Sequence, residues 1–254
     1  LESFLIRLFA GDGKYEVLNR NEGITNADYF DRHTYRREFN EIFDALRAEG
    51  LFNSSIKDIE NSDLYKLSPF KSLNPEQAIA VEDIVDGLLA DLATGVESTA
   101  VIQGDPGTGK TIVAIFLMKL LQDLAAWTPH ENEYSDSMFS ELFVPENAAA
   151  LKDLRMALVV PQQSLRESIK RVFHHTSGLN KRMVLSPFEV GAAKGEFDLL
   201  IVDESHRLNQ RANQPSAAQN AKFRDITTAL FGCDDTSKTQ LDWIVAKSRH
   251  RILL

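Results

Sequence analysis

Eight residues near the middle of the sequence have the types and spacing needed to bind phosphate. They read Gly-Asp-Pro-Gly-Thr-Gly-Lys-Thr and follow a short apolar run, 99–102. Glycines permit backbone angles that turn N–H groups toward an anion, a lysine adds charge, and a threonine hydroxyl can bind Mg²⁺. A helix after the loop would point its positive end at the same anion. We therefore expect ATP and Mg²⁺ to be bound by Gly104, Asp105, Pro106, Gly107, Thr108, Gly109, Lys110 and Thr111.

Two carboxylates end a second apolar run. Asp203 and Glu204 directly follow 197–202, which reads as a buried strand. Ligands of open α/β sheets bind at the carboxyl ends of such strands. We expect Asp203 to hold the magnesium ion through water and Glu204 to orient and deprotonate the attacking water, with Lys110 as the third catalytic residue. The alternative is a pair of acids that merely caps a strand. The role of His206 stays open: it could relay between the nucleotide and a neighbouring domain, or merely satisfy backbone groups in the turn.

Gln77 lies in the first turn of a predicted helix. Asn74 is a good helix cap, Pro75 suits the first helical position, and Gln77 can close a capping box. The same side chain could contact adenine. The two interpretations are compatible, and we favour the adenine contact.

A polar loop follows the strand predicted at 156–160. It consists of Pro161, Gln162, Gln163 and Ser164, with Lys170 and Arg171 further along. One interpretation is that Ser164 only caps the next helix. The other is that the loop contacts the sugar–phosphate backbone of a nucleic acid strand.

These groups need a scaffold that brings strand ends together. Apolar strands alternate with amphipathic helices, which predicts an α/β fold with a parallel sheet and helices on both faces. The expected strands are 99–102, 156–160, 183–185 and 197–202, and the expected helices are 75–92, 111–127 and 163–175. We expect an acidic surface insertion at 128–150 and a mobile loop at 209–220.

The predicted domain organisation has three parts. Residues 1–52 read as a small α+β segment, in which Asn26 or Asp28 caps the second helix. Residues 53–72 are polar and read as a linker, and 73–254 form the main domain. The chain begins without methionine and ends on an apolar run, so we expect it to be part of a longer protein.

Composition restricts the class of protein but does not indicate whether its partner is a nucleic acid or a protein. The chain of 254 residues has a net charge of −9, a single cysteine and no apolar stretch long enough for a membrane helix. A cytoplasmic location fits these features. The acidic balance mildly disfavours a broad nucleic-acid-binding face but leaves room for a local one.

The four motifs occur in an order that resembles a known family. Leu-Asn-Pro-Glu-Gln, the glycine-rich loop, Leu-Val-Val-Pro-Gln-Gln-Ser-Leu and Ile-Val-Asp-Glu-Ser-His resemble the first RecA-like domain of a superfamily 1 helicase, of the Schlafen-type DNA/RNA helicase domain family. The resemblance implies that Gln77 reads adenine, that Lys110, Thr111, Asp203 and Glu204 hydrolyse ATP, and that 161–165 faces single-stranded DNA or RNA. Such helicases also use a second RecA-like domain with an arginine finger, which this sequence lacks.

The first segment carries a weaker resemblance. Glu-Ser-Phe-Leu-Ile-Arg, followed by Lys-Tyr-Glu-Val-Leu-Asn, is similar to the end of a GIY-YIG nuclease domain, in which Glu2 would fall at a metal-binding position. The alternative is a small helical accessory segment. In either case we expect no nuclease activity from this chain, because the tyrosines and arginine of such a nuclease are absent.

Two functional hypotheses therefore stand together. The first is an ATP-dependent motor on nucleic acid, and the second is an ATP-driven switch whose partner is a protein. A small-molecule kinase fits less well, since such kinases rarely carry a paired Asp-Glu at the end of the later strand.

Overall fold

A computed structural model describes residues 2–18, 32–71, 73–129 and 138–254. The predicted caps Asn26 and Asp28 lie outside these residues. The elements are α1 (Glu2–Asp12), α2 (Arg32–Ala48), α3 (Ile56–Asn61), α4 (Asp63–Lys66), α5 (Pro75–Thr94), β1 (Ser98–Val101), α6 (Lys110–Ala126), η1 (Ser140–Leu142), α7 (Pro145–Leu151), β2 (Met156–Val159), α8 (Gln163–His174), η2 (Lys181–Met183), β3 (Val184–Leu185), α9 (Pro187–Gly191), β4 (Phe197–Val202), η3 (Ser205–Arg207), η4 (Arg211–Asn213), α10 (Ala217–Phe231), α11 (Gln240–Lys247) and β5 (Ser248–Leu253).

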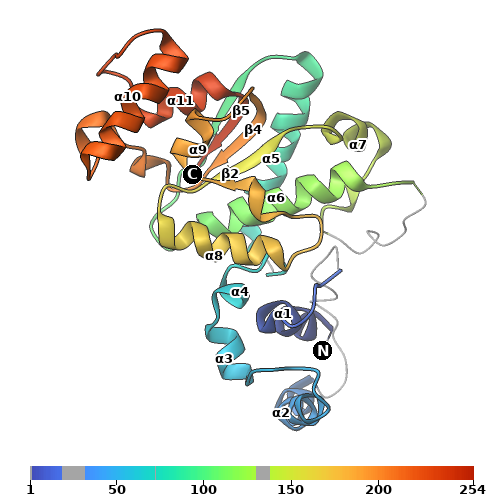
Figure 1. Cartoon of the computed structure of the whole chain (residues 1–254). Coiled ribbons are helices and arrows are strands. Elements are labelled where there is room, and N and C mark those ends of the chain that lie inside the picture. Colours follow the sequence, from blue (N-terminus) through green and yellow to red (C-terminus); the bar gives the residue numbers. More distant parts are fainter. Residues whose placement is uncertain (1, 19–31, 72, 130–137) are drawn as a thin grey trace.

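The centre of the molecule is a five-stranded sheet in which every pair is parallel. Its order is β1-β5-β4-β2-β3. Side chains on one face, such as Leu158 and Ile201, pack against α5, α6 and α8, and those on the other face, such as Leu200, pack against Ile244 of α11. Figure 1 shows these helices on both sides of the sheet. The predicted RecA-like α/β fold class is confirmed.

Local capping chemistry defines the helix that begins the main domain. The Gln77 backbone N–H donates to Asn74 Oδ1 at 2.8 Å, and the Asn74 N–H donates to Gln77 Oε1 at 3.0 Å. Pro75 occupies the first turn and Gly95, in a left-handed conformation, ends the helix. The predicted capping box is therefore confirmed.

The strand β5 is absent from the sequence-based prediction. It lies between β1 and β4, where Leu253 pairs with both Val101 and Val202. The apolar run at the end of the chain supplies only its last residues; its first four residues are polar, and His250 and Arg251 are buried among them. The Arg251 guanidinium donates to the carbonyls of Ser98 at 3.0 Å and Val245 at 3.2 Å, so its polar groups are satisfied.

Two predicted loops are more ordered than the sequence indicated. The surface-insertion prediction for 128–150 is wrong within 138–150, where Phe139 and Phe143 join the core and Phe139 packs on Phe116 of α6. The predicted loop 209–220 contains η4 and the start of α10, whose first turn is capped by Ser216. Polar composition concealed both: in 138–150 a few apolar side chains are buried among polar ones, and α10 buries its first large apolar side chain, Phe223, only beyond 220.

The N-terminal segment packs on the main domain through α8 (Figure 1). The Asp63 carboxylate of α4 accepts hydrogen bonds from Ser168 at 2.6 Å and Arg171 at 2.9 Å. Val17, expected in a short strand, forms an isolated bridge with Thr176. Residues 53–72 hold α3 and α4, with Ile59 buried. The domain boundaries themselves stay predictions.

Membrane insertion by a helix finds no support in the described part of the chain. None of its helices combines the length and apolar character needed to cross a bilayer.

Two helical glycines provide a matched test of the packing. A Cβ at Gly191 would lie 2.6 Å from Ile226 Cγ2 and 3.0 Å from Trp243 Cε3, whereas a Cβ at Gly87 would meet no atom within 4 Å. We expect Gly191→Ala to lower the free energy of unfolding by about 1–3 kcal/mol through overpacking. Gly87→Ala should raise it by about 0.5–1 kcal/mol, because alanine favours the helix. Urea denaturation measures both, and equal effects would contradict the packing of α9 on α10 and α11.

Candidate functional site

The glycine-rich loop joins β1 to α6 at the carboxyl edge of the sheet. Gly107 and Gly109 have φ of 84° and 87°, in the left-handed region that favours glycine. Lys110 Nζ donates to the carbonyls of Gly104 at 2.7 Å and Asp105 at 3.2 Å, so its charge is held within the curve of the loop. Gly109 precedes α6 without a side-chain cap. The first N–H groups of α6 therefore remain available to an anion.

A side-chain hydrogen bond connects this loop to the end of β4. Thr111 Oγ1 donates to Asp203 Oδ2 at 2.8 Å, across 92 residues of sequence. The structure thus brings together two residues that the sequence assigned to one metal ion. Their oxygens are of the kind that Mg²⁺ prefers, and Mg²⁺ commonly takes only one or two protein ligands.

Asp203 is fully buried, and its second oxygen is unsatisfied. Among the described residues, Asp203 Oδ1 is a buried side-chain atom without a hydrogen-bond partner. Burial raises the pKa of Asp203, and the nearby Glu204 raises it further, while the hydrogen bond from Thr111 and the charge of Lys110 oppose the shift. An unsatisfied buried carboxylate oxygen is costly unless a cation or donor reaches it. The arrangement is therefore suited to a cation.

Glu204 occupies an unusual backbone conformation at the same edge. It has φ of 53°, the one positive value found for a non-glycine residue in the described chain. Its Oε2 lies 3.2 Å from Arg207 Nε and 3.2 Å from His206 Nε2. His206 therefore pairs with Glu204 in this structure. Arg207 was missed by the sequence analysis, although an arginine three residues after a glutamate in a turn is a signal for such a contact.

Gln77 contacts the glycine-rich loop directly. Its Nε2 donates to the Thr108 carbonyl at 2.8 Å, while its Oε1 completes the capping box. A Cβ at position 109 would lie 2.6 Å from this Nε2, so the close approach requires Gly109. In this structure the amide of Gln77 therefore links α5 to the loop. Its contact with adenine stays a prediction.

The predicted nucleic-acid loop lies at the carboxyl end of β2, on the same edge as Asp203. Gln162, Gln163 and Ser164 are exposed there. Ser164 does not cap α8, because the N-cap position belongs to Gln162, whose Nε2 donates to Ser164 Oγ at 3.1 Å.

Arg166, which the sequence analysis overlooked, contacts the backbone at the start of this loop. Its NH1 group donates to the carbonyls of Val160 at 2.8 Å and Pro161 at 3.2 Å. Arg171, expected near the loop, instead pairs with Asp63 of α4. The basic side chain that touches the loop is thus the one in the first turn of α8.

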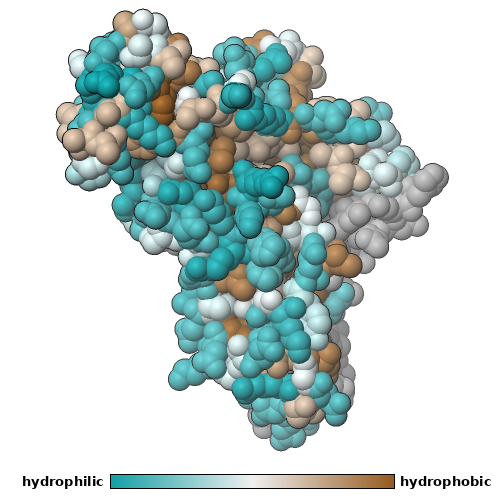
Figure 2. Space-filling view, viewed as in Figure 1, coloured by the Kyte–Doolittle hydropathy of each residue, from teal (hydrophilic) through white to brown (hydrophobic). Residues whose placement is uncertain are grey.

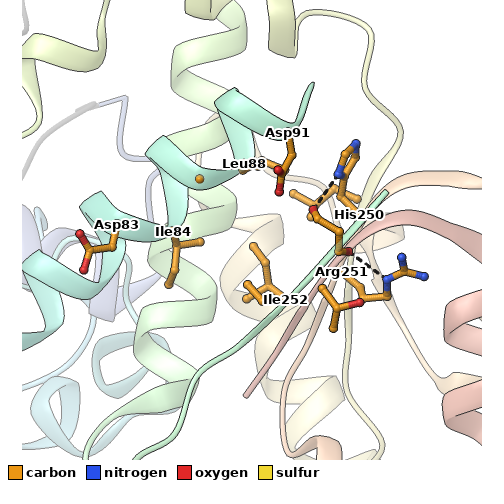
Figure 3. Close-up of a pocket in the computed structure, with 12 residues that line it drawn as sticks. Asp83, Ile84, Leu88, Asp91, His250, Arg251 and Ile252 are labelled. Atoms are coloured by element: carbon orange, nitrogen blue, oxygen red, sulfur yellow. Dashed lines mark hydrogen bonds between the residues drawn. The ribbon is translucent and has the colours of Figure 1, made fainter. Parts of the chain in front are cut away.

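A cavity of about 200 Å³ lies elsewhere, between α5 and the strands β1 and β5 (Figure 3). Ser98 Oγ and His250 Nδ1 are 3.0 Å apart in its wall, and burial lowers the pKa of His250. Leu199, which pairs with His250, also lines it near the start of β4. The cavity therefore lies away from the carboxyl edge, and it contains none of the predicted site residues.

The all-parallel sheet, with a glycine-rich turn between β1 and α6, defines a RecA-like α/β domain. Residues 97–230 match the family described as Schlafen group 3, DNA/RNA helicase domain. Because the match covers more than half of the 254 residues, the chain belongs to this family. Membership indicates a helicase-like function and interaction with nucleic acid. No curated protein and no solved structure is similar enough to the chain to count as a match.

The family match includes most of the candidate site. The glycine-rich loop, 161–164, Asp203 and Glu204 fall within 97–230, whereas Gln77 and the whole N-terminal segment fall outside. The resemblance of that segment to a nuclease domain stays a prediction. So do the roles of the individual site residues.

Burial of Asp203 generates a prediction about stability in metal-free buffer. Because the folded-state pKa is raised, the folded chain binds a proton more tightly than the unfolded chain, and ionisation of Asp203 lowers stability above that pKa. Asp203→Asn should therefore raise the free energy of unfolding at pH 7. The gain should shrink as the pH falls through the folded pKa, where wild-type Asp203 becomes neutral. Denaturation in EDTA at several pH values measures this, with Asp198→Asn at the start of β4 as control. A gain independent of pH would contradict the assigned cause.

Proposed function

We propose that the chain binds ATP with Mg²⁺ in the glycine-rich loop and hydrolyses it as a motor domain of a DNA/RNA helicase or translocase. The observation that carries the proposal is the 2.8 Å contact between Thr111 and the buried Asp203, which joins the loop to the end of β4. Family membership supports it, because helicase domains work on nucleic acid.

Each residue has a definite task in this proposal. Lys110 and the loop N–H groups hold the phosphates, and Thr111 with Asp203 would hold Mg²⁺. The ion would neutralise charge that develops on the phosphates during transfer. Glu204, at the exposed side of the same edge, orients the attacking water and accepts its proton. The pair formed by Glu204 and Arg207 must open, or turn toward solvent, for that water to bind.

The nucleic acid partner in this proposal is a single strand of DNA or RNA on the loop 161–164. This loop and the nucleotide loop lie on one sheet edge, so a strand bound at the first would be near the second. A second RecA-like domain would complete the motor. The alternative is a switch that acts on a protein partner, which the net charge of −9 mildly favours.

Two substitutions separate nucleotide binding from chemistry. Lys110→Ala should weaken the binding of a fluorescent ATP analogue by about tenfold or more, since a charge-assisted contact contributes about 1.5–3 kcal/mol. Glu204→Gln should keep the affinity but lower ATP turnover by about 10²-fold or more. Anisotropy and phosphate release measure the two quantities, with the exposed Lys152→Ala as control. Full turnover in Glu204→Gln would refute its role as base.

Strand dependence of turnover distinguishes the motor from the switch. Single-stranded DNA or RNA that stimulates ATP turnover in the wild type but not in Lys110→Ala supports the motor. Turnover that requires Lys110 but ignores every strand supports the protein-partnered switch.

The contact of Arg166 with the loop carbonyls generates a further prediction. Arg166→Ala removes both donors and should lower the affinity for a single strand by about fivefold to tenfold, the scale of a hydrogen bond of about 1 kcal/mol or more. ATP-analogue affinity should not change, because Arg166 does not contact the nucleotide loop. Arg166→Lys, which keeps the charge, is the matched variant. If Arg166→Lys restores full affinity, charge rather than loop geometry is responsible.

A further inference from the structure

The chain is acidic overall, but one continuous stretch is basic. Residues 161–186 contain Arg166, Lys170, Arg171, Lys181 and Arg182 and a single acid, Glu167, which gives +5 − 1 = +4 with histidines neutral. The complete chain has a net charge of −9. Positive charge in this stretch is therefore concentrated on α8 and on η2, which precedes β3. In Figure 2 the surface over α8 is hydrophilic.

Four of these cations flank the outermost strand of the sheet. Arg166 and Lys170 lie on the flank of α8 that faces Glu189, just beyond the carboxyl end of β3. Burial raises the pKa of Glu189, but hydrogen bonds from Ser186, assisted by the charges of Lys170 and Arg166, hold it below its ordinary value. Lys181 and Arg182 are exposed in η2, which packs on α8 and leads into β3. We call Arg166, Lys170, Lys181 and Arg182 the β3 strip. From position 182 to 186 an extended backbone covers about 13 Å.

Two acids near the β3 strip, Glu167 and Glu189, are already occupied. Glu189 accepts from the Ser186 N–H and hydroxyl at 2.6 Å each, and Glu167 pairs with Lys170 at 3.1 Å. Within the described part of the chain, no carboxylate lies within salt-bridge distance of Lys181 or Arg182. Arg171 is excluded from the strip because it points to α4 and pairs with Asp63. The end of the strip at η2 therefore offers two exposed, uncompensated cations.

We propose that the β3 strip lies along the path of a nucleic acid strand that passes over the loop 161–164 and continues along β3, where Lys181 and Arg182 bind its phosphates while Arg166 positions the loop. The proposal rests on the proposed nucleic-acid function of that loop. Lys181 and Arg182 are exposed, and exposed lysines and arginines commonly contact phosphate, which sets position rather than sequence preference. The strip would extend the contact with the nucleic acid beyond the carboxyl edge of the sheet and direct the nucleic acid away from the nucleotide site.

The test compares charge reversal on the strip with a matched reversal elsewhere. The test variant is Lys181→Glu with Arg182→Glu, and the control is Lys57→Glu with Lys152→Glu, both exposed and outside α8, η2 and β3. Anisotropy of labelled oligo-dT and oligo-U strands of about 4 and about 16 nucleotides, which bracket known site sizes, is measured between about 50 and 200 mM salt. Thermal unfolding confirms that each variant is folded, and Lys181→Gln with Arg182→Gln replaces the reversal if it is not.

We expect the strip variant to bind the longer strand about tenfold more weakly at low salt. The slope of log affinity against log salt should fall by about 1.4, which corresponds to two phosphates on a single strand. Affinity for the short strand, which reaches only the loop, should not change. ATP turnover without nucleic acid should also be unchanged.

The possible failures are distinguishable. If the wild type binds both strands and the strip variant matches it, the strip is refuted and the loop function stands. Equal losses in test and control variants, or loss of the short strand as well, would also refute the strip. If the wild type binds neither strand, the proposed nucleic-acid function fails. Poly-glutamate that binds the strip while nucleic acid does not would assign the surface to an acidic protein instead.

Discussion

The parallel insertion of β5 between β1 and β4 is the constraint on which the site geometry depends. Two strand spacings separate the end of β1 from the end of β4, about 10 Å in total. Hydrogen bonds from Ile102 and Ser205 to the carbonyls of Leu253 and Leu254 connect both strand ends to β5, at 2.8 and 2.7 Å. A side chain from the loop could not bridge that gap directly. The first turn of α6 rises over the sheet edge, and from there Thr111 reaches Asp203.

The carboxyl edge of the sheet carries two features that raise the free energy of the folded state, and the rest of the fold must offset them. Asp203 is a buried acid with an unsatisfied oxygen, and Glu204 adopts a backbone conformation that is unfavourable for residues with a side chain. Both follow directly from β4, whose last four residues are fully buried. The buried strand fixes the position of the two acids, and a cation or a rearranged hydrogen bond would relieve the charge. Strained, charged edges on a rigid apolar sheet are characteristic of ligand-binding sites.

How far the sequence predicts this structure depends on whether the signal is local. The runs that form β2 and β4, the capping box at Asn74 and the glycine-rich loop are each specified by neighbouring residues, and the structure agrees with them. The strand β5 was missed because its first four residues are polar, and the carbonyls that satisfy the buried Arg251 include one 153 positions away. Arg166 was missed for a different reason, since a helical arginine reads as solvent-exposed unless the preceding loop folds back over it.

The same locality limits what could be predicted about the site. The motifs and their order predicted that Thr111 and Asp203 bind the same Mg²⁺ ion. The 2.8 Å contact between the two side chains fits that expectation. No pattern predicted that Gln77 would donate to Thr108, because that bond depends on how α5 packs beside the loop. The residues proposed to contribute chemistry can thus be predicted from local sequence patterns. The residues that position them are specified by contacts across the fold.

The helix α8 connects the loop at 161–164 to α4. Its first turn holds the loop carbonyls through Arg166, and its last turn pairs with α4 through Arg171. Hydrogen bonds from Ser168 and Arg171 lower the pKa of Asp63, so this contact remains charged at neutral pH. Because the pair is half-exposed, it contributes at most about 1 kcal/mol and orients the N-terminal segment more than it anchors it. A twelve-residue helix is about 18 Å long and nearly rigid. The same helix therefore positions the loop at 161–164 through Arg166 and contacts α4 through Arg171, at a fixed spacing between the two.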